Sequence, residues 1–188
     1  MNQFTLKLME FSEEGFPDKV TFLWSPEEAQ KISKEHKDQI HFINEEGAKF
    51  LNNLYRSSKI EFDEQYRHSL NEEYYSNISR FEGNWNDDKE VKKWLYNRGI
   101  PFSKYVLITS DRSGKPVLLT WKMVIKYWKG IFWEDDISIL DTSFKWCFYY
   151  YHESEFYFGK DIIFDRKKED EKAIELNKNI QEWMNKLK

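Results

Sequence analysis

The fold is decided near the C-terminus by the stretch Trp146-Cys147-Phe148-Tyr149-Tyr150-Tyr151-His152-Glu153-Ser154-Glu155-Phe156-Tyr157-Phe158. Two runs rich in aromatic residues, 146–151 and 155–158, flank three polar residues. Aromatic side chains favour strands, and a short polar break between two such runs favours a turn. The stretch therefore predicts a β-hairpin whose tip is His152-Glu153-Ser154.

Further strand patterns precede this hairpin. Residues 105–108 form a continuous apolar run, which is typical of a central strand that is covered on both faces. Residues 117–119 follow a polar turn at 111–116 and are expected to pair back on that strand. Residues 137–140 read as another strand, and residues 74–81 are a further candidate. Together these segments predict a mainly antiparallel sheet.

Helices are expected between the strands because apolar residues recur at helical spacing behind good capping residues. Ser25-Pro26-Glu27-Glu28 combines an N-cap serine, a proline at the first helical position and a glutamate two residues further on, which is a capping box. The predicted helices run from Ser25 to about Lys37, from Glu45 to about Arg56, from Asp87 to Gly99, and from Thr120 to Gly130.

The two ends of the chain also carry patterns. Phe4, Leu6 and Leu8 alternate with polar residues, which predicts a strand that forms an opening hairpin with residues 20–24. At the other end, helical spacing predicts an amphipathic helix that docks on the domain through Ile174, Ile180, Trp183, Met184 and Leu187. The fold class is therefore α+β, with residues 1–188 forming one globular domain.

Composition narrows the class of protein. The 188 residues are 40% hydrophobic and 33% charged, and nothing approaches the roughly 18 apolar residues of a membrane-spanning helix. The N-terminus lacks the features of a secretory signal, and Cys147 is the single cysteine, so we expect a cytoplasmic protein without disulfides. The net charge of −4 argues against direct binding of nucleic acid.

No motif in the sequence is specific for catalysis. The four histidines, at positions 36, 41, 68 and 152, lack the spacing of a metal site. Residues 110–115 lack the glycine frame of a phosphate loop, and Cys147 lies among aromatic residues, as expected of a buried residue. The sequence therefore predicts no catalytic residue, no metal and no cofactor.

The distribution of acidic and aromatic residues suggests a protein partner. Aromatic residues make up 18% of the chain, and exposed Trp and Tyr dominate protein interfaces. Residues 61–90 hold nine acids against three basic residues, and residues 134–161 hold seven acids against two lysines. Such a surface suits a basic protein partner. The residues expected to bind it are Trp133, Glu134, Asp135, Asp136, Tyr151, Glu153 and Glu155.

A resemblance supports this hypothesis. The stretch from Ile108 to Trp121, together with residues 146–153, resembles the small cytosolic immunity proteins of bacterial toxin systems, which are short, acidic and rich in tryptophan. The likeness is one of character, so no functional residue is carried over from that family. It implies a non-enzymatic protein that binds one cognate toxin and blocks its active site.

Two alternatives remain open. One is a hydrolase-like enzyme whose site would use His152 with Glu153 or Asp136 on a sheet face. Neighbours on a strand point to opposite faces, so we expect His152 and Glu153 not to converge. The other is a subunit of a larger assembly that uses its C-terminal helix as the contact. For the favoured hypothesis, reversing the charges of Asp135 and Asp136 should weaken binding and leave thermal stability nearly unchanged.

Overall fold

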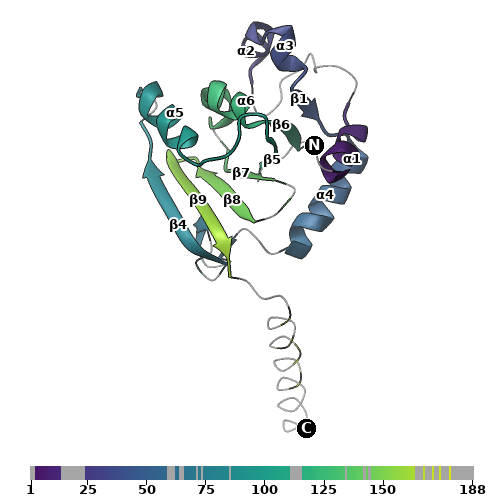
Figure 1. Ribbon diagram of the computed structural model, residues 1–188, viewed down its shortest axis with the longest axis vertical. Helices are drawn as coiled ribbons and strands as arrows, with labels where there is room; N and C mark the ends of the chain where they lie inside the picture. Colours follow the sequence, from purple (N-terminus) through teal and green to yellow (C-terminus); the bar gives the residue numbers. More distant parts are fainter. Residues whose placement is uncertain are drawn as a thin grey trace.

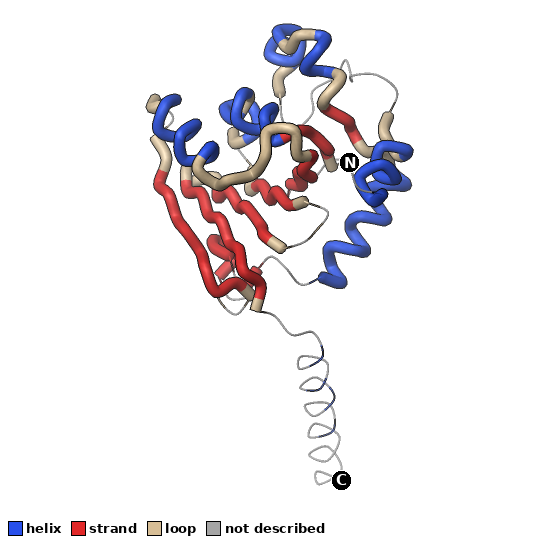
Figure 2. Tube along the Cα trace, viewed as in Figure 1, coloured by secondary structure: helices blue, strands red, loops and turns tan. Residues whose placement is uncertain are grey.

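A computed structural model gives the fold of the chain (Figures 1 and 2). It describes residues 3–13, 24–58, 62–63, 66–70, 72, 74–84, 86–110, 116–133, 135–141, 143 and 145–163, together with residues 167, 171, 174 and 178. No helix in these residues combines the length and the apolar character that crossing a membrane requires.

The centre of the fold is a seven-stranded sheet in which every neighbouring pair is antiparallel. Its order is β1-β6-β5-β7-β8-β9-β4, and a separate pair joins β2 to β3. Together with the helices this is an α+β fold, as predicted. The strands are β1 (Ile40–Phe42), β2 (Phe62–Asp63), β3 (Tyr66–Leu70), β4 (Tyr75–Glu82), β5 (Tyr105–Ser110), β6 (Val117–Thr120), β7 (Ile137–Leu140), β8 (Trp146–Tyr151) and β9 (Glu155–Ile162).

The predicted aromatic hairpin is formed by β8 and β9. Tyr151 pairs with Glu155 beside the turn, and Trp146 pairs with Lys160 at the far end. Because side chains alternate along a strand, the hairpin presents different residues on its two faces. Trp146, Phe148 and Phe158 lie on one face, while Cys147 and Tyr149 lie on the other.

Helices cover the first face, which holds the largest core cluster. They are α2 (Pro26–Lys31), α5 (Asp88–Tyr96), α6 (Trp121–Lys126) and α7 (Trp128–Ile131), and they pack against β5–β9. Trp121 and Phe132 are fully buried against Phe148. The indole of Trp128 donates a hydrogen bond of 2.8 Å to Asp88, which ties α7 to α5. Much of the aromatic content of the chain is therefore in the core.

The second face has two covers. Over β5, β6 and β7 lie α1 (Gln3–Glu10) and α4 (Glu45–Ser58), which contribute Leu8 and Leu51 to a cluster with Leu118. Over β8 and β9, the end of β3 and the start of β4 contribute Leu70 and Tyr75 to a cluster with Cys147, Tyr149 and Tyr157. Cys147 is fully buried, as expected.

The prediction of a strand at the N-terminus is wrong, because residues 3–10 form helix α1. Thr5 and Leu8 are buried, whereas Leu6 is half exposed, so the buried positions are three residues apart. Packing against the sheet therefore selects the helical period over the alternation of Phe4, Leu6 and Leu8. Of the partner strand expected at 20–24, residues 20–23 lie outside the described part.

The helices following Ser25 and Thr120 are each broken in two. The capping box at Ser25 and Glu28 forms as predicted, but α2 ends at Lys31 and a short α3 (Lys34–Lys37) follows. Thr120 precedes α6 but does not cap it, because its hydroxyl donates to the side-chain carbonyl of Gln39. Two predicted helices, α4 and α5, are continuous.

Most of the expected C-terminal helix lies outside the described residues, including Ile180, Trp183, Met184 and Leu187. Ile174 is helical but 70% exposed, so the expected docking on the domain does not occur at this residue.

Candidate functional site

The predicted partner-binding residues gather at the turn end of the β8–β9 hairpin. Because Ile137 pairs with Tyr150, Asp136 lies beside the turn that follows β8. We call this surface the acidic hairpin end, and we define it as Trp133, Asp135, Asp136, Tyr151, His152, Glu153 and Glu155. Glu134 lies outside the described residues.

Asp136 and His152 link the segment before β7 to the turn that follows β8. One carboxylate oxygen of Asp136 accepts a hydrogen bond of 3.0 Å from the backbone N–H of His152 and lies 2.8 Å from Nδ1 of its ring. A carboxylate can only accept, so the ring nitrogen donates. Nε2 of His152 is 3.7 Å from Glu153. The expectation that His152 and Glu153 would not converge is wrong, because both belong to the turn rather than to a strand.

Glu155 is engaged by two neighbours. Arg80 on β4 donates to it at 2.6 Å, and the hydroxyl of Tyr157 donates to its other oxygen. The bond to Glu155 raises the pKa of Arg80. Burial, followed by the bond to Glu155, raises the pKa of Tyr157 to about 12. Arg80 is not predicted from the sequence. It lies close to Glu155 because β4 pairs with β9, and no local sequence pattern indicates this pairing.

The aromatic residues of this surface differ in exposure. Trp133 is 63% exposed, whereas Tyr151 is half-buried and its ring centroid lies 4.4 Å from that of His152. Burial raises the pKa of Tyr151, and so do Glu153 and Asp136, because a phenolate beside carboxylates is disfavoured. Tyr151 therefore lies beside His152 and close to the carboxylates of Asp136 and Glu153.

Three of the four described acids also stabilise the fold. Asp135 accepts a hydrogen bond of 2.9 Å from Ser110, Asp136 holds the turn, and Glu155 joins β9 to β4. Reversing the charges of Asp135 and Asp136 would therefore break internal contacts as well as alter the surface. Glu153 is the best position at which to test binding separately from stability, since its side chain is 70% exposed.

Asp136 and His152 are the residues of this surface that a hydrolase could use. The Asp136–His152 pair has the orientation that a general base requires, and one pocket among the described residues lies at the opposite end of the hairpin, around Trp146 and Lys160. The described residues hold no group of three or more His, Cys, Asp or Glu side chains placed to bind a metal ion.

No protein-family model matches the chain, nor does any curated protein or solved structure.

Proposed function

We propose that the chain is a non-enzymatic protein-binding protein and that, within this class, it is an immunity protein that blocks a cognate bacterial toxin. The observation that carries the proposal is the acidic hairpin end itself. It combines an exposed tryptophan and two carboxylates from the segment before β7 with a half-buried tyrosine and two further carboxylates at the β8–β9 turn, and Asp136 links the two parts through His152. Tryptophan and tyrosine are the residues that most often dominate binding energy at interfaces.

The mechanism would be occlusion of a basic cleft. The carboxylates steer a positively charged partner during encounter, and the two rings supply contact area once the surfaces meet. A turn that is held by Asp136 through two contacts loses little conformational freedom on binding, which favours affinity. A toxin that acts on nucleic acid has a basic active site of the kind such a surface would cover.

The test compares two surface variants with a matched control. The full chain and its Trp133→Ala and Glu153→Lys variants are used to capture a partner from the native lysate, and Glu10→Lys, an exposed position on α1, is the charge-matched control. We expect the wild type and the control to capture one stoichiometric basic protein, and both surface variants to bind it at least tenfold more weakly with unchanged thermal stability.

The immunity function needs a second readout. The captured partner is expressed alone and together with the chain, and we expect growth arrest in the first case and its relief in the second. Equal capture by all the variants would refute the proposed surface. A partner that is harmless when expressed alone would refute the immunity function and leave the binding function standing.

A further inference from the structure

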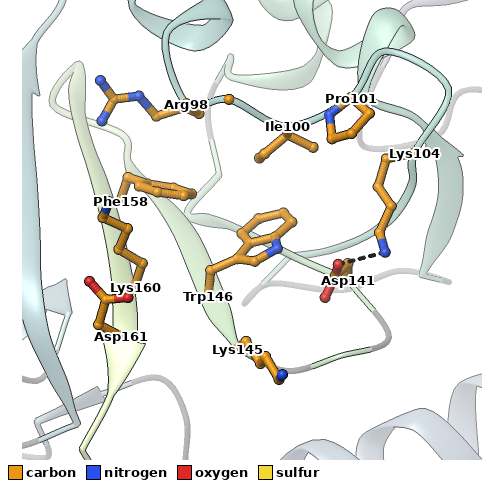
Figure 3. Close-up of a pocket in the computed structure, with 11 residues that line it drawn as sticks. Arg98, Ile100, Pro101, Lys104, Asp141, Lys145, Trp146, Phe158, Lys160 and Asp161 are labelled. Atoms are coloured by element: carbon orange, nitrogen blue, oxygen red, sulfur yellow. Dashed lines mark ion pairs between the residues drawn. The ribbon is translucent and has the colours of Figure 1, made fainter.

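A second site lies at the other end of the β8–β9 hairpin. There the helices no longer cover the first face of the sheet, and the last cross-strand pair, Trp146 and Lys160, borders an open pocket of about 310 Å³ (Figure 3). The segment that follows α5, including Ile100 and Pro101, forms its opposite wall. This volume lies at the lower end of the range for small-molecule sites.

The lining of this pocket is basic although the chain is acidic. Arg98, Lys104, Lys145 and Lys160 line it together with only two acids, Asp141 and Asp161. Lys104 forms an ion pair of 2.9 Å with the buried Asp141 (Figure 3), which leaves three cations against one carboxylate. Lys145 and Lys160 are exposed, and neither pairs with an acid in the described part of the chain. The pocket therefore favours an anion.

Aromatic side chains form the floor of the pocket. The indole of Trp146 lies at the centre of the view in Figure 3 and is half-buried. Its ring centroid is 5.7 Å from that of Phe158, and the buried Trp121 supports it from behind at 6.3 Å. An indole supported in this way provides a rigid surface on which a flat ring can stack.

Arg98 is held in place before any ligand binds. Its guanidinium donates to the carbonyl of Trp94 at 3.0 Å and to the hydroxyl of Ser79 at 2.6 Å. It also lies 5.4 Å from the ring centroid of Phe158. A cation fixed by three neighbours contributes to the positive potential of the pocket at little cost in side-chain entropy.

We propose that this pocket binds a small anion that carries a flat ring, the chemistry that a nucleoside monophosphate presents. The ring stacks on Trp146, and the cations that line the pocket, Arg98, Lys145 and Lys160, attract the anionic group. The pocket and the acidic hairpin end are at opposite ends of β8 and β9, so this proposal does not depend on the proposed protein partner.

Calorimetric titration of the full chain with four probes tests each part of this proposal. Adenosine monophosphate carries both the ring and the charge, phenyl phosphate carries another ring with the same charge, adenosine carries the ring alone, and inorganic phosphate carries the charge alone. We expect the two ring-bearing phosphates to bind at least tenfold more tightly than the other two probes. Added salt should weaken their binding, because Lys145 and Lys160 are exposed.

Variants locate the site. The double variant Lys145→Gln/Lys160→Gln should lose at least tenfold in affinity for adenosine monophosphate, while Lys7→Gln/Lys49→Gln, two exposed lysines on α1 and α4, should bind as the wild type does. Trp146→Leu should weaken the ring-bearing phosphates, and the more conservative Trp146→Phe should restore part of the loss.

Three results would overturn the proposal. They are no binding of either ring-bearing phosphate, unchanged binding by the Lys145→Gln/Lys160→Gln variant, and inorganic phosphate binding as tightly as adenosine monophosphate. Thermal denaturation of each variant distinguishes the loss of the site from the loss of the fold.

Discussion

Replacing Gly159 with alanine should destabilise the protein, although glycine is normally the poorer residue within a strand. Gly159 lies in β9 on the face that holds Cys147 and Tyr149. A Cβ atom added there would lie 2.8 Å from two ring atoms of Tyr75 and 2.9 Å from a methyl group of Leu70. These distances are shorter than van der Waals contact, so the Tyr75 ring must move.

The expected cost follows from two opposing terms. Forcing an extra carbon into a packed core costs about 1–3 kcal/mol. Removing a glycine from a strand recovers about 0.5–1 kcal/mol of conformational entropy. The first term is larger, because the near atoms of Tyr75 belong to a rigid ring that is itself buried. With the steric cost at about 2 kcal/mol, the middle of its range, the net loss is about 1–1.5 kcal/mol, which lowers the melting temperature by about 2–6 °C for a chain of this size.

Urea unfolding followed by circular dichroism measures this loss. The urea concentration at the midpoint of unfolding should fall, while the slope of the unfolding free energy against urea concentration should be unchanged. This is expected when a substitution changes only the stability. The Tyr75→Ala variant provides the internal control, since in that background Gly159→Ala should cost nothing or should stabilise. A full cost that persists without the Tyr75 ring, or no cost in the wild type, would refute the steric explanation.

Three further changes test other parts of the structure. Asp141→Asn should lower the free energy of unfolding by about 1–3 kcal/mol at neutral pH, because it removes the ion pair with Lys104. Burial tends to raise the pKa of Asp141, but hydrogen bonds from Lys104 and Ser143 outweigh it and hold this pKa below 3.8. The stabilisation is therefore present above that value and lost as the pH falls through the lowered pKa. The free energies of unfolding of the wild type and the variant, measured in urea, should converge once the pH is below the lowered pKa. His152→Ala should reduce protection of the cell only as far as it weakens partner capture, whereas loss of protection with intact partner capture would favour the hydrolase alternative. Ser25→Ala should cost about 1 kcal/mol by thermal denaturation, and Ser25→Asp should restore it, because the side chain caps α2.

The strands could be predicted where the pattern of the sequence matches their burial. The continuous apolar run at 105–108 is a central strand, and the break at His152 is the hairpin turn, since no other arrangement buries the flanking rings. The alternation of Phe4, Leu6 and Leu8 predicts a strand, but the buried residues of this segment are Thr5 and Leu8, which are three positions apart as on one face of a helix. Only the packing of Leu8 beside Leu51 distinguishes the two.

The acidic hairpin end could be predicted in part. Asp136 and His152, which the sequence places in separate segments, lie together because β7 and β8 are neighbours in the sheet. Arg80 could not be found, since it comes from a strand 75 residues away in the sequence. The basic pocket was missed for the same reason. Its lysines are isolated in the sequence and line one pocket only because β9 pairs with β8 and α5 ends beside them.

The order of the strands has a consequence for how the chain is made. Strands β5–β9 come from one continuous part of the sequence, whereas both edge strands, β1 and β4, come from earlier residues. Ile40 pairs with Leu119 and Tyr75 pairs with Ile162, so each edge strand is synthesised long before its partner. A chain leaves the ribosome from its N-terminus. Strands β1 and β4 therefore emerge before the strands with which they pair have been synthesised. Ribosome-bound chains of increasing length should therefore show protease resistance in β4 only after Ile162 has emerged, and earlier resistance there would contradict this order of assembly.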